Sequence, residues 1–320
     1  MLSAKANMRE MSLTKIDNQH LVKTLLVILA HPDDESFGPG GTLAKYAHEG
    51  VAVHYLCGTR GESGTIDSHR LDGFADAGEL RAAELMCAAR ELKLAGVHFL
   101  GFRDSGMVGT PDNEHPESLH AAPLDEVARR IGEYIINLRP NAIVTHDQFG
   151  GYGHPDHIKL NQATLRAYEM LFGLRIDLSR WNTDDKKVAL VTRVDSSAKN
   201  SASEVAPPKL YFTIFPKGMI KFGVRVMPLF RQDPTKFGRN KDINLAQISS
   251  WDVPQTAKIN TNGYEEMKAR ASACHASQQM PANQGNILMR MAFRRGRGVE
   301  YFSRVYPPFK MGDPPEKDLV

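Results

Sequence analysis

The stretch "TLLVILAHPDDES", residues 24–36, joins an apolar run directly to a histidine and three consecutive acids. Residues 24–30 are typical of a strand buried on both faces, because they are almost wholly apolar and partly β-branched. Adjacent carboxylates repel one another, so a surface loop gains nothing from Asp33, Asp34 and Glu35 in a row. The order therefore indicates that a positive group, a metal ion above all, belongs at the end of this strand.

The alternation of apolar runs with helical patterns continues to about residue 173. Further strand-like runs lie at 51–57, 97–102 and 142–147, and helical patterns lie at 41–50, 76–96 and 123–140. Strands that alternate with helices in this way favour right-handed βαβ units. We therefore expect an α/β fold, a Rossmann-like and mostly parallel sheet with helices on both faces.

The second half of the chain has a weaker pattern. Strands are expected at 188–194, 209–215 and 299–307, a helix at 263–279, and an exposed loop at 195–208. We expect a flexible segment over 1–23 and one domain over 24–320. Its core would be 24–173, and its extension, 174–320, would continue the sheet and wall the pocket.

Composition limits the classes of partner. The formal net charge of +3 over 320 residues is too close to neutral for nucleic acid to be the main partner. Cys57, Cys87 and Cys274 lie far apart and form no CxxC pair, which argues against disulfides or a thiolate zinc site and suits a reducing cytoplasm. No segment reaches the roughly 20 apolar residues that span a bilayer. A cytoplasmic protein without a membrane span is expected; a homo-oligomer is left open.

Two clusters of metal-binding residue types follow predicted parallel strands. In such sheets ligands bind beyond the carboxyl ends of the strands. A catalytic zinc needs three protein ligands and one open position. His31 and Asp34 can both come from the first loop, and "GGYGHPDH", residues 150–157, offers His154, Asp156 and His157 for the third. The two clusters together are far more specific than either one alone.

Four loop motifs occur in order: "AHPDDE" (30–35), "TRGESGT" (59–65), "FRDSGM" (102–107) and "GGYGHPDH" (150–157). With "ACHASQ" (273–278) and "EYFSRVYP" (300–307), the chain resembles the PIG-L/LmbE-like family of zinc-dependent N-acetylglucosaminyl deacetylases. It is most similar to the branch acting on N-acetylglucosaminyl-inositol and its thiol conjugates. The resemblance implies a hydrolase that removes the acetyl group from a small molecule containing N-acetylglucosamine.

The resemblance also implies roles for individual residues. His31, Asp34 and His157 would bind Zn²⁺, Asp33 would be the general base, and Arg60 would contact the substrate. Iron(II) could occupy the same set of two nitrogens and one oxygen.

Other roles follow from the chemistry of amide hydrolysis. The oxyanion needs donors besides the metal, each worth about 2.7–4 kcal/mol, and Tyr152 and His154 are placed for this. A protonated His154 could also act as general acid toward the departing amine. We expect Asp156 to hold the His154 imidazole and raise its pKa, with a helix N-cap as the alternative. Asp104 would either accept hydrogen bonds from sugar hydroxyls or pair with Arg103.

Three alternative functions would explain part of the same sequence pattern. An amidase of a cysteinyl-glucosaminyl conjugate would use the same loops. A non-haem iron oxygenase would match His31, Asp33 and His157, but the helical alternation and Asp34 oppose it. An inactive metal- or sugar-binding module would lack Asp33 or His154, and both are present.

Four features remain outside these roles. The basic stretch 217–241 is either a solvated face or a contact for an anionic substrate. Glu35 is expected near a helix N-terminus, Glu62 on its own loop backbone, and His275 as a buried hydrogen-bonding residue.

Overall fold

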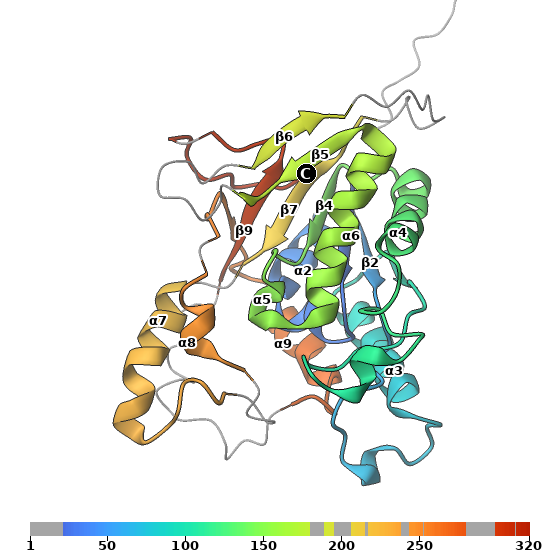
Figure 1. Ribbon diagram of the computed structural model, residues 1–320, viewed down its shortest axis with the longest axis vertical. Helices are drawn as coiled ribbons and strands as arrows, with labels where there is room; N and C mark the ends of the chain where they lie inside the picture. Colours follow the sequence, from blue (N-terminus) through green and yellow to red (C-terminus); the bar gives the residue numbers. More distant parts are fainter. Residues whose placement is uncertain are drawn as a thin grey trace, which may run out of the picture.

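A computed structural model describes residues 22–179, 189–194, 206–214, 217–237, 243–251, 253–279, 298–310 and 312–320. Its central feature is a seven-stranded sheet of order β3-β2-β1-β4-β7-β9-β8 (Figure 1). The first five strands in this order run parallel, and β9 is antiparallel to both of its neighbours. The strands are β1 (Thr24–Leu29), β2 (Ala52–Cys57), β3 (Gly96–Phe99), β4 (Ala142–Thr145), β7 (Lys209–Thr213), β8 (Ala257–Asn260) and β9 (Val299–Tyr306).

Helices cover both faces of this sheet, as the alternation predicts (Figure 1). Successive side chains of a strand point to opposite faces of the sheet, so β1 contributes residues to two hydrophobic cores. Leu26 and Ile28 pack with α4 and α6, whereas Leu25, Val27 and Leu29 pack with α2, α3 and α9. The helices are α1 (Asp34–Phe37), α2 (Gly40–His48), α3 (Ala77–Glu91), α4 (Leu124–Leu138), α5 (Gly150–Gly153), α6 (Pro155–Phe172), α7 (Lys217–Val226), α8 (Leu245–Ile248) and α9 (Glu265–Cys274). Short 3₁₀ turns lie at Ser68–Arg70, Pro111–Glu114 and Met227–Phe230, the last labelled η4.

The C-terminal part extends the sheet, with two departures from expectation. β7, β9 and β8 continue it beyond β4, as predicted. The run at 188–194 does not join it: β6 (Leu190–Arg193) pairs with β5 (Leu174–Asp177) in a separate antiparallel pair. The helix expected over 263–279 ends at Cys274, because the following residues turn inward and bury His275 and Ser277.

The prediction of no disulfide is wrong. Cys87 of α3 and Cys274 at the end of α9 form a disulfide, with their Cα atoms 5.8 Å apart and a sequence separation of 187. The pairing depends on the packing of α3 against α9, which no cysteine spacing reveals. Cys57 is free and buried.

Two further expectations concern regions that the structure leaves largely undescribed. The flexible N-terminal segment and most of the 195–208 loop lie outside the described residues.

None of the described helices is long and apolar enough to cross a membrane. The cytoplasmic location remains a prediction from the sequence.

Candidate functional site

The first loop beyond β1 holds Asp33 in an unusual backbone conformation. Its φ of 125° and ψ of −30° lie in a region that residues with side chains rarely adopt, at a cost of about 1–3 kcal/mol. Hydrogen bonds on both sides of the residue hold this conformation. The Asp33 carbonyl accepts from the N–H of Phe37, and the Glu35 carboxylate accepts from the Asp33 N–H at 3.0 Å. Such strain persists only where the surroundings over-determine it, which is typical of functional loops.

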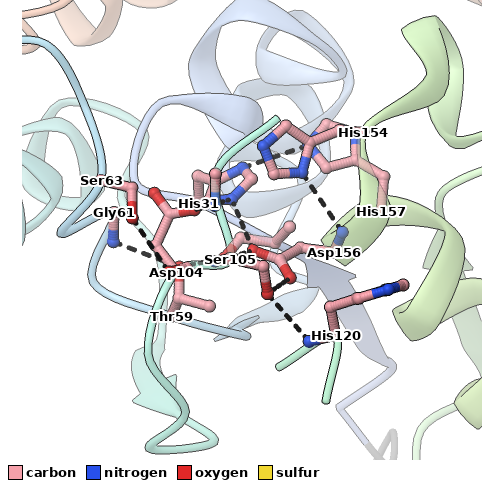
Figure 2. Close-up of polar contacts among 12 residues, drawn as sticks. His31, Thr59, Gly61, Ser63, Asp104, Ser105, His120, His154, Asp156 and His157 are labelled. Atoms are coloured by element: carbon pink, nitrogen blue, oxygen red, sulfur yellow. Dashed lines mark hydrogen bonds and ion pairs between the residues drawn. The ribbon is translucent and has the colours of Figure 1, made fainter. Parts of the chain in front are cut away.

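Three predicted metal ligands meet at one point. His31 Nδ1 lies 3.1 Å from His157 Nε2 and 3.7 Å from Asp34 Oδ2, and His157 Nε2 lies 3.5 Å from the same oxygen (Figure 2 shows the two histidines). Ligand atoms about 2.1 Å from a tetrahedral metal lie about 3.4 Å from one another. The triangle therefore fits a divalent ion with two nitrogen ligands and one oxygen ligand.

The other ring nitrogen of His31 faces two carboxylates. His31 Nε2 lies 3.3 Å from Asp156 Oδ2 and 3.5 Å from Asp104 Oδ1 (Figure 2). Burial disfavours the imidazolium, but these acids outweigh burial and raise the pKa of His31. A metal-binding histidine ordinarily donates its second N–H to a carboxylate, which fixes its tautomer and orientation. The surroundings of His31 match that pattern.

His154 and Asp156 contact each other differently from the prediction. The Asp156 carboxylate accepts from the Ser105 N–H at 3.0 Å and from the Ser105 hydroxyl, and it faces His31, not His154. His154 Nδ1 accepts from the Asp156 backbone N–H at 3.2 Å, so His154 is itself the N-cap of α6 (Figure 2). Burial and the neighbouring His31 lower the pKa of His154 to about 3, opposite to the predicted direction. A helix begins here because Pro155 occupies its first position, where no N–H is needed.

Arg81 was missed from the sequence, although it is the buried cation of the site. Its Nη2 donates to Asp33 Oδ2 at 3.1 Å and to the Pro32 carbonyl at 2.8 Å, and its Nη1 donates to the Gly61 carbonyl at 3.0 Å. Burial raises the pKa of Asp33 to about 7, although Arg81 opposes the rise. A Cβ atom at Gly61 would lie 2.1 Å from Arg81 Nη1, so the glycine makes room for the guanidinium. That glycine, and the arginine at position 81 among the apolar residues of the buried face of α3, were the available signals.

Arg60 does not join the cluster. Its side chain is exposed, with its guanidinium 5.9 Å from the Phe99 ring centroid, because the neighbouring Thr59 points inward and donates to the Ala30 carbonyl. Arg103 pairs with Asp112 at 3.0 Å, so the alternative in which Asp104 pairs with Arg103 is wrong. The substrate contact implied for Arg60 stays a prediction.

Asp104 and Tyr152 both lie beside the histidines of the cluster. The Asp104 carboxylate is 4% exposed, accepts from the Gly106 N–H at 2.8 Å and lies 4.0 Å from Arg81 Nη1. The Tyr152 ring centroid lies 5.1 Å from that of His157 and 5.9 Å from that of His154. Burial raises the pKa of Tyr152 well above its usual range, so it is a donor at neutral pH.

His146 is a second histidine that sequence reasoning missed. It stacks on His157 at 3.7 Å between centroids, and its Nε2 lies 3.6 Å from Asp34 Oδ2. Asp34, His146 and His157 could thus form an alternative metal group. However, His146 Nε2 already accepts from the Ala30 N–H at 3.0 Å, so its lone pair is occupied. We therefore favour His31, Asp34 and His157 as the metal-binding group.

Buried polar pairs tie the C-terminal segment to the site. Glu35, in the first turn of α1 as predicted, is fully buried and lies 2.7 Å from His275 Nε2. His275 is therefore the buried hydrogen-bonding residue that was expected. Glu84 of α3 accepts from the Ser277 N–H at 2.8 Å and from its hydroxyl at 2.6 Å. The Glu62 side chain accepts from the Asp104 N–H at 3.0 Å, so it binds the backbone of the third loop. The prediction of a bond to its own loop backbone is therefore wrong.

Comparison with protein families supports the motif reading. Residues 26–168 match the model of the GlcNAc-PI de-N-acetylase (PIG-L) family. The chain is 32% identical over 312 residues to a 1D-myo-inositol 2-acetamido-2-deoxy-alpha-D-glucopyranoside deacetylase of Acidothermus cellulolyticus, covering 93% of this chain and 94% of the relative. A Thermomonospora curvata protein of the same name is also 32% identical, over 301 residues, covering 89% and 91%.

Solved structures share the fold at lower identity. N,N'-diacetylchitobiose deacetylase from Pyrococcus horikoshii superposes with a TM-score of 0.53 and 18% identity, covering 89% of this chain and 84% of that one. The 4-carboxy-2-hydroxymuconate hydratase of Pseudomonas putida gives a TM-score of 0.52 and 17% identity, covering 91% and 100%. At these identities the likeness concerns the fold, and the hydratase illustrates that one fold can support different reactions.

Proposed function

Because the chain belongs to the GlcNAc-PI de-N-acetylase (PIG-L) family, we propose that it is a metal-dependent amide hydrolase that removes the acetyl group from N-acetylglucosaminyl-inositol. The observation that carries the proposal is the convergence of His31, Asp34 and His157 beside the Asp33 carboxylate. The extensive match to relatives named as inositol-linked deacetylases supports the choice of substrate.

We assign the metal to His31 Nδ1, His157 Nε2 and an oxygen of Asp34. Zn²⁺ suits this donor set, and Fe²⁺ is the alternative. A divalent ion held there would lower the pKa of a bound water from 15.7 to about 7 and polarise the amide carbonyl. Asp104 and Asp156, on the far side of the His31 ring, would keep its Nδ1 lone pair directed at the ion.

Asp33 is the proposed general base. Its carboxylate neighbours the ligand triangle without belonging to it, and Arg81 holds one of its oxygens at 3.1 Å. Water loses a proton to Asp33 as its oxygen attacks the acetamide carbon. When the carbon–nitrogen bond breaks, that proton passes to the departing amine. The free amino sugar and acetic acid are the products, and the acid then loses its proton to the solvent and becomes acetate.

His154 and Tyr152 are the proposed donors to the oxyanion. Because His154 Nδ1 accepts a backbone N–H, the ring proton of the neutral imidazole lies on Nε2 and can be donated. This arrangement favours hydrogen-bond donation over the general-acid role for His154. Asp104, within 4.0 Å of Arg81, is proposed to accept hydrogen bonds from sugar hydroxyls.

Acetate release by the metal-loaded protein tests the proposal. The panel contains N-acetylglucosaminyl-inositol, N-acetylglucosamine, its chitobiose dimer and a cysteinyl-glucosaminyl conjugate, each with a chelated control. We expect chelator-sensitive acetate release, fastest with the inositol conjugate. Amine release from the cysteinyl conjugate alone would assign the protein to the amidase branch. Absence of hydrolysis on the whole panel, with metal bound, would refute the proposal.

A further inference from the structure

The segment from α7 to η4 presents a surface that the proposed activity does not use. Three large apolar side chains lie exposed within nine residues: Phe222 (56%), Leu229 (78%) and Phe230 (46%). Single exposed apolar residues are common, but a cluster on one short segment marks an interaction surface. We call this group, with Lys221, Arg225 and Arg231, the α7–η4 face.

The basic residues of the α7–η4 face border its apolar residues. Lys221 and Arg225 are exposed and one helical turn apart, one residue out of phase with Phe222 and Val226. Arg231 is exposed directly after Phe230. No acid occurs from residue 217 to 232. Met227, only 5% exposed, anchors the segment from its inner side.

The segment lies at the side of the molecule, away from the sheet, and connects to the site (Figure 1). Helix α7 packs on α8, and α8 packs on α5, which carries Tyr152. Trp251, just after α8, stacks on Phe149 with ring centroids 4.9 Å apart. A partner bound by the α7–η4 face would therefore lie beside the wall of the candidate site.

We infer that the α7–η4 face docks on an anionic lipid surface. Basic side chains beside exposed aromatic and aliphatic groups fit a layer that has negative headgroups above an apolar interior. A purely solvated face has no reason to expose Phe222, Leu229 and Phe230 together. A second copy placed symmetrically on this face would bring Lys221, Arg225 and Arg231 toward their own equivalents, and like charges repel.

The docking is peripheral. No described helix is long and apolar enough to span a bilayer, so the apolar side chains would enter only the headgroup boundary while the basic ones remain at the phosphates. One short apolar group with a few basic residues gives reversible attachment that weakens with salt.

Vesicle flotation of the full chain tests this inference. The two probes are phosphatidylcholine vesicles and vesicles with about one-third phosphatidylglycerol. The test variants are Phe222→Gln/Leu229→Gln and Lys221→Gln/Arg225→Gln. A matched control, Ile136→Gln/Met170→Gln, removes exposed apolar side chains from α4 and α6. Circular dichroism and the thermal midpoint verify that each variant is folded.

We expect wild type and the control to float with anionic vesicles and not with phosphatidylcholine alone. Each test variant should lose roughly tenfold in the vesicle-bound to free ratio, and raised salt should release the wild type. Failure of the wild type to bind anionic vesicles at low salt would overturn the inference. So would equal binding by the folded test variants, or a concentration-dependent dimer that those variants abolish in place of vesicle binding. Acetate release in solution is independent of these readouts.

Discussion

Glu35 and His275, 240 residues apart in sequence, form a fully buried pair with 2.7 Å between Oε1 and Nε2. The other Glu35 oxygen accepts from the N–H of Asp33. The C-terminal segment thus reaches the backbone of the proposed base through a single carboxylate. Burial lowers the pKa of His275, but Glu35 outweighs burial and the net pKa is raised, so the pair is charge-assisted.

Removing one member of this pair should be costly. His275→Phe leaves the Glu35 carboxylate buried without its partner, and we expect the free energy of unfolding to fall by about 3–5 kcal/mol. Glu35→Gln/His275→Phe should lose less than the two single changes added together, because the uncompensated charge is gone. Urea unfolding of the four proteins measures the coupling. Strictly additive losses would show that the two side chains do not interact.

Arg81 and Arg60 offer a direct comparison between structure and sequence. Arg81→Lys keeps the charge but loses the planar donors that reach Asp33, Pro32 and Gly61 at once. We expect kcat/KM for acetate release to fall roughly tenfold or more, as for a misplaced catalytic group. Arg60→Lys should change it less than twofold, given its exposed side chain. The reverse order would support the substrate contact that the family motif implied for Arg60.

The disulfide predicts a countable property. The oxidised protein should release one free thiol per chain on denaturation, that of Cys57, and three after reduction. Cys87→Ser/Cys274→Ser should lower the free energy of unfolding by about 2–4 kcal/mol, because the closed loop restricts the unfolded chain. Cys57→Ser is the control for thiol content. Three reactive thiols in the denatured, unreduced protein would rule out the disulfide.

We expect the pair His54 and His98 to make the protein less stable in mild acid. Their ring nitrogens lie 3.2 Å apart on neighbouring strands, and burial, with His98 acting on His54, lowers the pKa of both. A folded-state pKa below the unfolded value of about 6.5 means that the unfolded chain binds protons first as the pH falls. Stability should therefore be full above that pH and decrease below it. Comparing unfolding at pH 7.5 and 5.5, the decrease should be smaller in His54→Gln/His98→Gln. An unchanged decrease would assign it to other groups.

The fold and the ligand cluster could be predicted because both depend on local patterns. The apolar runs around Val27 and Val144 mark buried parallel strands, and the ends of such strands meet at one edge, which brings His31 near His157. The residues that were missed lie on other helices, and only tertiary packing brings them into contact with their partners. Arg81 reaches the site from the buried face of α3, and Cys274 meets Cys87 only because α9 lies against α3. No spacing along the chain encodes such contacts.

The assignment of Asp156 failed for a related reason. Proximity in sequence suggested that its carboxylate serves His154, but α6 begins at Pro155 and turns the Asp156 side chain toward Ser105 and His31. The helix start, and not the two-residue spacing, decides which histidine the acid contacts.

The central claim is that Asp33 acts as the base beside a metal held by other residues. The most direct test is acetate release by Asp33→Asn, measured together with bound metal per chain. We predict that one metal ion per chain is retained, while kcat falls by about 10²–10⁴-fold. A near-normal rate with metal bound would contradict the account.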